Sequence, residues 1–243
     1  MRVALLSGGS KGIGKGAVIQ LLIDGFSVVT FSRNAEQVST LRRELRSQFP
    51  DDRFLVLQAD VDAQSDVSRV VAETMKRYGR IDILINNAGF GYFSEADQVD
   101  LKIFAQMIHT NIFSLAVLTK AVLPHMKKQK SGLIINMASI SGQRAMPLGE
   151  FYSATKFGVM GYSDGLRKEV AEFGIKVCTV CPGMVQTDFF SVQELQRRKK
   201  RWGGKIPQML AVDDIRRVLS LIWAQAPHCD IQDIVMMPFE PVK

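Results

Sequence analysis

Short apolar runs alternate with longer amphipathic segments along the whole chain of 243 residues. The runs predicted as strands cover residues 2–7, 27–31, 53–58, 81–86, 133–137, 175–180 and 231–236. Segments with helical spacing of apolar residues separate them, at 13–24, 35–49, 64–78, 101–128, 150–173 and 213–224. Parallel neighbouring strands need a crossover, which is usually a helix. The alternation therefore predicts an α/β chain with a doubly wound parallel sheet of about seven strands and helices on both faces.

Composition excludes several other classes of protein. Hydrophobic residues make up 47% and charged residues 23%, as in an average soluble globular protein, so a disordered or collagen-like chain is excluded. No apolar run approaches the ~18 residues of a membrane span, and the run at 3–6 is too short for a secretion signal. We therefore expect a cytoplasmic protein that does not bind membranes.

Three cysteines are too few for a disulfide framework. Cys178 and Cys181 form a C-x-x-C pattern, but they lie in a predicted buried strand. Residues three apart on a strand point to opposite faces, so we do not expect a redox pair. His, Cys and acidic residues nowhere show metal-ligand spacing, and we expect no metal.

The net charge of +7 is concentrated in one segment. Residues 191–205 contain six cations and one acid, Glu194, which gives +5 and leaves +2 for the rest of the chain. The cations are Arg197, Arg198, Lys199, Lys200, Arg201 and Lys205. Three interpretations remain open: a solvated helical face, steering of an acidic substrate, or a nucleic-acid or membrane surface. The cations are not interleaved with aromatic residues, so we expect no nucleic-acid partner.

A glycine-rich turn joins the first predicted strand to the first predicted helix. Its sequence is Ser7-Gly-Gly-Ser-Lys-Gly-Ile-Gly14. Glycines at 8, 12 and 14 let the backbone turn sharply and approach a pyrophosphate, which the N–H groups of the following helix attract. The turn predicts a dinucleotide site; a tight turn without a ligand is the alternative.

The residues after the second predicted strand indicate which dinucleotide is bound. An NAD site usually has an acidic residue there for the ribose 2′-hydroxyl, but no Asp or Glu occurs between Asp24 and Glu36. Arg33 occupies this region, and Lys11 lies in the glycine turn. Two cations without a carboxylate favour a 2′-phosphate and hence NADP(H) over NAD(H), unless both are merely solvated.

Several further motifs occur in order after the glycine turn. They are Asp60-Val61, Asn86-Asn87-Ala88-Gly89, Asn111, Ser139, Tyr152-Ser-Ala-Thr-Lys156, and Pro182-Gly183 with Thr187. With this set the chain resembles the short-chain dehydrogenase/reductase family over essentially its whole length. The resemblance implies one Rossmann-like domain over residues 1–243. Met137-Ala138 departs from the Ile-Ser that often precedes the catalytic serine, but Ser139 itself is in place.

The resemblance also implies roles for particular residues. Asp60 and Val61 would contact adenine, Asn87, Ala88 and Gly89 the ribose and sheet side, and Val185 and Thr187 the nicotinamide amide. The full set expected to bind coenzyme is Gly8, Ser10, Lys11, Gly12, Ile13, Gly14, Arg33, Asp60, Val61, Asn87, Ala88, Gly89, Tyr152, Lys156, Pro182, Gly183, Val185 and Thr187. The catalytic set is Asn111, Ser139, Tyr152 and Lys156.

The catalytic residue types suit hydride transfer to a carbonyl, which creates negative charge on its oxygen. Tyr152 and Lys156 are four apart on a predicted helix and share a face. A free tyrosine has a pKa of ~10, and a neighbouring ammonium, together with the cationic nicotinamide of the oxidised coenzyme, is expected to lower it. Ser139 follows a strand end and can hydrogen-bond the substrate oxygen. By resemblance, Asn111 orients a water that passes protons to Lys156.

We therefore predict an oxidoreductase acting on CH–OH groups, which transfers hydride between NADP(H) and the carbonyl or secondary alcohol of a small substrate. A 3-oxo or 3-hydroxy acid is one candidate substrate. The alternatives are a catalytically silent NADP(H)-binding regulatory or scaffold protein of the same fold, and a basic RNA-associated Rossmann protein.

Substrate choice is expected to depend on residues 141–151 and on a lid segment, 184–210. The expected apolar wall comprises Phe189, Phe190, Trp202, Ile206, Met209 and Leu210. Arg144 is a candidate for binding a substrate carboxylate, or a solvated loop residue. Residues 101–123 and 151–170 carry more apolar side chains than one core-facing stripe needs, for example Phe113 and Val117, so we expect a homo-oligomer, a tetramer or dimer.

Overall fold

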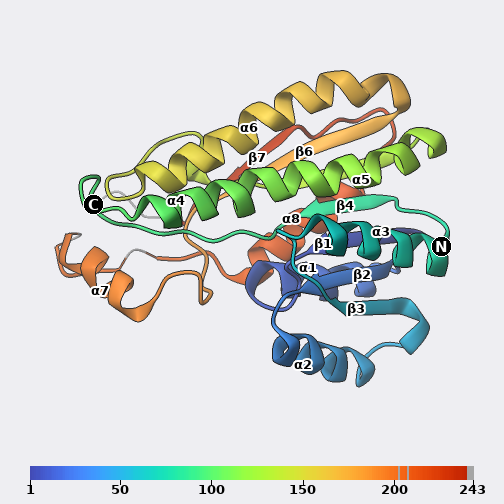
Figure 1. Cartoon of the computed structure of the whole chain (residues 1–243), viewed down its shortest axis with the longest axis horizontal. Helices are drawn as coiled ribbons and strands as arrows, with labels where there is room; N and C mark the ends of the chain where they lie inside the picture. The colour runs from blue at the N-terminus through green and yellow to red at the C-terminus, as the bar shows by residue number, and fades with distance from the viewer. Residues whose placement is uncertain (202, 207, 240–243) are drawn as a thin grey trace.

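Seven parallel strands form one sheet in the computed structural model, which describes residues 1–201, 203–206 and 208–239 (Figure 1). The strands are β1 Val3–Ser7, β2 Ser27–Ser32, β3 Phe54–Gln58, β4 Ile83–Asn86, β5 Gly132–Met137, β6 Ile175–Pro182 and β7 Asp233–Met236. Their order is β3-β2-β1-β4-β5-β6-β7. The chain builds outward from β1 and then crosses back to β4, so the order reverses between these two strands. The predicted seven-stranded α/β fold is confirmed.

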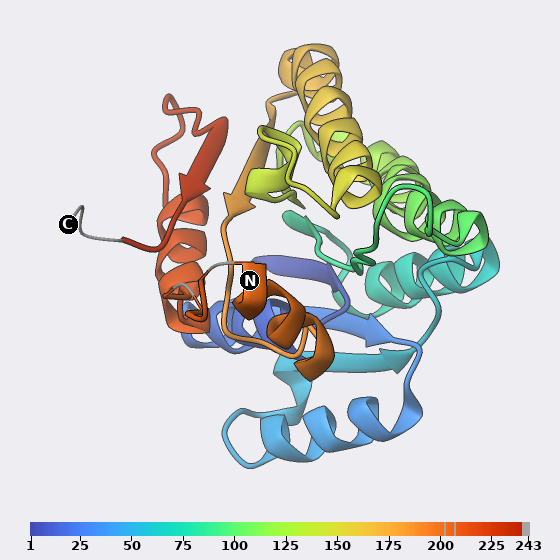
Figure 2. The same ribbon diagram turned by 90° about the vertical axis from the view of Figure 1, so that its left-hand side faces the viewer.

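Helices cover both faces of the sheet (Figures 1 and 2). They are α1 Gly12–Ile23, α2 Ala35–Arg46, α3 Gln64–Tyr78, α4 Leu101–Ile108, α5 Ser114–Gln129, α6 Glu150–Val170, α7 Val192–Arg201 and α8 Val212–Trp223. One core packs α1, α2 and α8 on the sheet, and another packs α3, α5 and α6 on the opposite face. Figure 2 shows α7 in front of the strands, apart from the helices that cover the two faces.

The strands are apolar runs because both of their faces are buried. In β1, Leu6 belongs to the core under α1, while its neighbour Leu5 belongs to the core under α3 and α5. The same alternation separates the two strand cysteines. Cys178 lies in the core on the α1 side, and Cys181 packs with Leu115 and Val159 of α5 and α6. Both thiols are free, and the predicted placement on opposite faces is confirmed.

The helix predicted over 101–128 consists of three parts. A π-helical segment, His109–Phe113, separates α4 from α5. Pro124 lies inside α5 without ending it. Val122 and Met126 are fully buried on either side of the proline, so packing on the sheet holds both halves of the helix in line. The helix α7 had no predicted bounds, since its segment entered the sequence analysis as part of the lid segment 184–210 and as a basic run for which a solvated helical face was one of three interpretations.

The stretch Leu101–Gln129 is apolar enough to span a membrane by length and composition, with a mean hydropathy of 1.4 over an 18-residue window. The sequence analysis missed this because polar residues interrupt the run. In the structure the stretch packs on the sheet, with Leu118 and Val122 in the core. Only 33% of the window is buried, so much of its apolar surface lies outside the core.

Candidate active site

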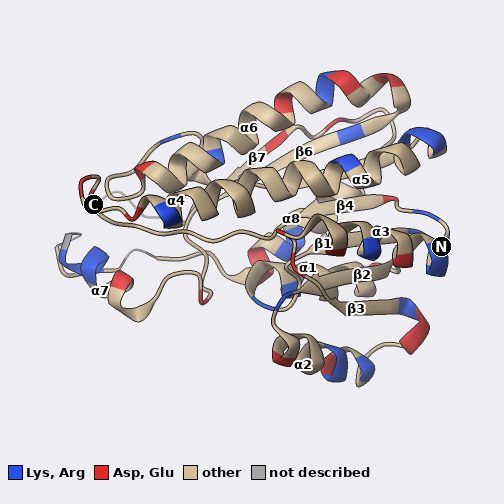
Figure 3. Ribbon diagram, viewed as in Figure 1, with Lys and Arg blue, Asp and Glu red and all other residues tan. Residues whose placement is uncertain are grey.

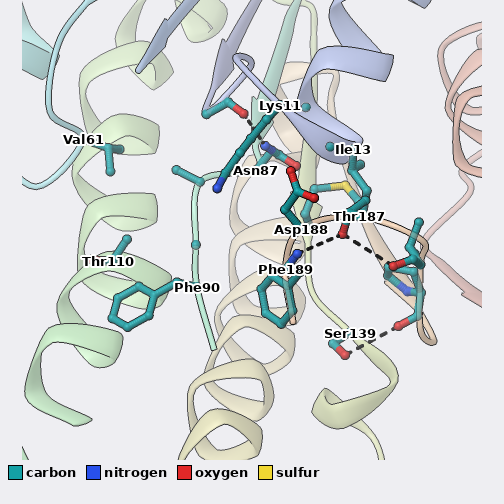
Figure 4. Close-up of a pocket in the computed structure, with 18 of the residues that line it drawn as sticks. Lys11, Ile13, Val61, Asn87, Phe90, Thr110, Ser139, Thr187, Asp188 and Phe189 are labelled. Carbon is teal, nitrogen blue, oxygen red and sulfur yellow. Dashed lines mark hydrogen bonds between the residues drawn. The ribbon is translucent and has the colours of Figure 1, made fainter. Parts of the chain in front are cut away.

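A cavity of about 490 Å³ opens at the carboxyl ends of the strands, where the strand order reverses between β1 and β4 (Figure 4). Ligands of open α/β sheets bind at this kind of switch point. All eighteen residues predicted to bind coenzyme line the cavity, including Ser10, Ile13, Asp60, Val61 and Pro182. The structure thus brings the whole predicted set together, although it leaves the role of each residue untested.

The glycine turn forms one wall of the cavity. Gly8 and Gly12 have φ angles of +71° and +53°, which disfavour residues with a side chain. A Cβ on Gly14 would meet the carbonyl oxygen of Gly8 and lie 2.5 Å from Asn87 Nδ2. Asn87 Nδ2 donates to the carbonyl oxygens of Ser7 and Gly8 at 3.1 and 3.0 Å, which fixes the turn to the end of β4. The start of α1 thus faces open space with free N–H groups, and this cradle fits a pyrophosphate.

The two predicted cations lie at the β1–β2 side of the cavity. Lys11 and Arg33 are exposed and line it, and Figure 4 shows Lys11 extending into the open space. Within the described part of the chain neither forms an ion pair with a carboxylate. Beside them Ser10 Oγ donates to Gln37 Oε1 at 2.8 Å, so Gln37, which the sequence analysis missed, also shapes this corner. The corner is cationic and suits an anionic group.

Tyr152 and Lys156 project from α6 into the cavity, and both are buried. Lys156 Nζ donates to the carbonyl oxygen of Met137 at 2.8 Å and lies 5.8 Å from the centroid of the Tyr152 ring. Ser139 follows β5, and its hydroxyl accepts a hydrogen bond from Ser141 N at 3.1 Å. Tyr152, Lys156 and Ser139 are the three predicted catalytic residues that line the cavity. Figure 4 labels Ser139, which shows where this part of the cavity lies.

The electrostatics differ from the expectation. Burial raises the pKa of Tyr152 to about 12, although a hydrogen bond with Ser139 acts in the opposite direction. Burial also lowers the pKa of Lys156 to about 8, opposed by the Cys181 thiol. In the protein alone, burial therefore outweighs any lowering of the tyrosine pKa, and the lowering expected from the ammonium and the oxidised coenzyme together stays a prediction. The reason is that desolvation disfavours the phenolate while the ammonium is directed to Met137.

Asn111 does not line the cavity; it lies behind Gly89 in the π-helical segment. A Cβ on Gly89 would lie 2.9 Å from Asn111 Oδ1. Asn111 Nδ2 donates to the carbonyl oxygen of Phe90 and to Thr155 Oγ1, and Oδ1 accepts from Phe90 N, at 2.9, 3.0 and 3.0 Å. The side chain therefore positions the backbone after Gly89. The expected water relay to Lys156 stays a prediction.

Two lining residues missed by the sequence analysis connect the part of the cavity near Asp60 and Val61 to the π-helical segment. Thr110 Oγ1 donates to Asp62 Oδ2 at 2.7 Å, and both residues line the cavity. Asp62 lies two residues after Asp60, but the sequence gives no sign that it meets Thr110, since 48 positions separate them.

Aromatic side chains enclose the space in front of Tyr152. Its ring centroid is 5.4 Å from that of Phe93 and 5.7 Å from that of Phe189, and Phe190 also lines the cavity. Met146 lines the cavity beside these rings. We call the three phenylalanines Phe93, Phe189 and Phe190, together with Met146, the aromatic wall. Phe189 and Phe190 were predicted; Phe90 and Phe93, in the aromatic stretch after Gly89, were missed although that stretch was a visible signal.

The other residues expected near the substrate lie elsewhere. Ile206 is exposed, and neither it nor Met209 lines the cavity. Leu210 packs against the core on the α1 side and forms a bridge with Val185. Arg144 is exposed and outside the cavity, so the prediction that it binds a substrate carboxylate has no support in the geometry. Trp202 lies outside the described residues.

The basic segment is not uniformly solvated. Figure 3 shows cations gathered on α7. Arg197, Lys199, Lys200 and Lys205 are exposed, but Arg198 is only 8% exposed. None of the three interpretations of this segment included a buried arginine.

Comparison with known proteins assigns the family. A model described as short chain dehydrogenase matches residues 2–198. The chain belongs to the short-chain dehydrogenase/reductase family. It is similar to an uncharacterized oxidoreductase of Staphylococcus saprophyticus, with 32% identity over 98% of this chain and 97% of the relative. A similar protein of Staphylococcus haemolyticus is 30% identical over 98% of this chain and 97% of the relative.

Two solved structures that contain NADP are similar to this chain in fold. The closed form of serine dehydrogenase complexed with NADP+ has a TM-score of 0.86 and 27% identity, over 97% of this chain and 94% of that one. ElxO with NADP bound has a TM-score of 0.85 and 25% identity, over 97% of each chain. The chain is thus an oxidoreductase of the short-chain type with a nucleotide-binding fold.

Proposed function

We propose that this oxidoreductase transfers hydride between NADP(H) and the carbonyl or secondary alcohol of a small substrate, with Tyr152 as general acid and base. The observation that carries the proposal is the shared cavity. Buried Tyr152 and Ser139 face the space that the glycine turn also borders. A proton donor, a hydroxyl donor and a pyrophosphate cradle are the groups that this reaction requires.

The residues of the chain supply binding, orientation and the proton. The bound coenzyme would supply the hydride. The glycine turn and the start of α1 would hold its phosphates, and Ser139 would orient the substrate oxygen. Because burial raises its pKa, Tyr152 keeps its proton at neutral pH, and it would donate this proton from Oη to that oxygen as the hydride arrives.

The preference for NADP(H) rests on Lys11 and Arg33. Both lie at the cavity edge without a carboxylate partner among the described residues, and the serine dehydrogenase and ElxO structures above contain NADP. Replacing Arg33→Ala should weaken NADPH binding about ten- to hundredfold, the value of a charge-assisted contact, and leave NADH binding unchanged. Arg43→Ala, an exposed arginine outside the cavity, is the matched control. Equal losses for NADPH and NADH would contradict the assignment.

The substrate side of the cavity favours apolar groups next to the carbonyl. The aromatic wall borders this space, while Arg144 is exposed and does not line it. A 3-oxo or 3-hydroxy acid stays a candidate because serine dehydrogenase is a structural neighbour. The test is a thermal-shift screen with NADP(H) and NAD(H), followed by NADPH oxidation over paired 3-oxo acids and apolar ketones. Coenzyme binding without turnover on the whole panel would favour the scaffold alternative.

We also propose that the protein forms a homo-oligomer through α4, α5 and α6. Ile108 in α4, Phe113 in the π-helical segment before α5, and Phe157 in α6 are 41–47% exposed. Gly158 of α6 lies close to Ile112 of the π-helical segment, so these two elements pack against each other there. Phe157 precedes Gly158 and Phe113 follows Ile112, so both exposed rings flank this contact. An apolar surface of this kind is typical of protein interfaces.

A further inference from the structure

Of Arg197 and Arg198, the two arginines of α7 whose side chains the structure describes, Arg198 is buried, and it lies against the aromatic wall. Its guanidinium carbon lies 4.4 Å from the ring centroid of Phe93 and 4.6 Å from that of Phe190. Its Nη1 lies 3.6 Å from Met146 Sδ. The two ring centroids are 5.3 Å apart, so the guanidinium lies against both rings from one side. A guanidinium placed in this way, out of water, makes strong cation–π contacts.

These three partners come from loops that are distant in the sequence. Phe93 follows β4, Met146 precedes α6, and Phe190 follows β6. All three line the cavity, and Phe93 also contacts the Tyr152 ring. One side chain of α7 thus joins the loops that form the substrate side of the site.

Glu194 completes the arrangement from within α7. It lies one helical turn before Arg198, and its Oε1 is 3.9 Å from Arg198 Nη2. Burial raises the pKa of Glu194 and lowers that of Arg198, and the attraction between them opposes both shifts. Because both groups lose water when α7 docks, the pair orients the guanidinium and adds little attraction of its own.

We propose that Arg198 is a positioning residue that fixes helix α7 against the aromatic wall and so sets the shape of the substrate side of the site. Its cation–π contacts with Phe93 and Phe190 make α7 a docked lid rather than a solvated basic helix. The exposed cations Arg197, Lys199 and Lys200 do not contribute to this docking.

Limited digestion with trypsin tests the docking without any substrate. Arg198→Met keeps an unbranched apolar chain at this position but removes the charged guanidinium. Arg197→Met is the matched control, because each variant lacks one arginine and therefore one cleavage site. We expect cleavage at the remaining sites of α7 to be about tenfold faster in Arg198→Met than in the control, because a desolvated cation–π pair is lost. Cleavage after Lys168 in α6 should stay unchanged. Arg198→Lys should restore most of the protection.

Kinetics provide a second readout, which rests on the reductase activity proposed above. For a ketone reduced by the wild type, Arg198→Met should raise KM about tenfold, with kcat within about twofold and the Kd of NADPH unchanged. A loss of folded protein would lower the apparent kcat and leave KM alone. Equal digestion of the two methionine variants, or faster cleavage at every site together, would overturn the proposal. Absence of any turnover would contradict the proposed function but not the digestion result.

Discussion

Replacing Lys156→Met should make the protein more stable and abolish its activity. Burial lowers the pKa of Lys156 from 10.5 to about 8. At pH 7 this shift corresponds to a loss of about 3 kcal/mol in the free energy of unfolding, because the folded protein buries a charged ammonium. The variant loses the hydrogen bond to the Met137 carbonyl, worth about 1 to 1.5 kcal/mol. The expected net gain is about 1 to 2 kcal/mol, or a rise in Tm of about 2 to 8 °C for a chain of this size.

The gain should depend on pH with a definite sign. Between pH 8 and 10.5 the unfolded lysine binds a proton that the folded one has released, so the wild type becomes more stable as pH rises. Methionine has no such dependence. The difference in the free energy of unfolding between variant and wild type should therefore be largest near pH 7 and smaller at pH 9.5.

Urea denaturation at pH 7 and pH 9.5 measures both quantities. Lys102→Met, which replaces an exposed lysine, is the control and should change stability by less than about 0.5 kcal/mol at either pH. The reasoning fails if Lys156→Met is less stable than the wild type at pH 7, or if its advantage does not shrink at pH 9.5.

Two further changes test the coenzyme cradle and the oligomer. Gly14→Ala places a Cβ against the Gly8 carbonyl and Asn87 Nδ2, so the Kd of NADPH, measured by fluorescence titration, should rise about ten- to hundredfold. An unchanged Kd would show that the turn does not hold the phosphates. Phe157→Asp places a charge on the exposed apolar face of α6 and should convert the oligomer to a smaller species in light scattering, with Tm as a check on folding. A wild-type protein that is monomeric at micromolar concentration would contradict the proposed interface.

The sequence predicted the sheet well because its signals are local. Apolar runs bounded by glycines, such as β1 before Gly8, require only the covalent neighbourhood to be recognised. The helix α3 was predicted with its observed bounds, since its apolar period is regular and Gly79 adopts the left-handed conformation that ends it.

Features that depend on distant contacts were missed. The π-helical segment around Asn111 is held by Phe90 and Thr155, which are 21 and 44 positions away. Likewise, a run of cations appears uniform in the sequence, and only the meeting of three loops selects Arg198 for burial. Desolvation also decided the pKa of Tyr152, and burial in front of an aromatic wall cannot be inferred from the spacing of Tyr152 and Lys156 alone.

The most direct test of the proposed chemistry is the Tyr152→Phe variant, measured for NADPH binding and for carbonyl reduction. Phenylalanine keeps the ring that packs against Phe93 and Phe189 but removes the proton donor. We predict a Kd for NADPH within about twofold of the wild type and a kcat at least about a hundredfold lower. A kcat close to that of the wild type would contradict the assignment of Tyr152 as the acid and base.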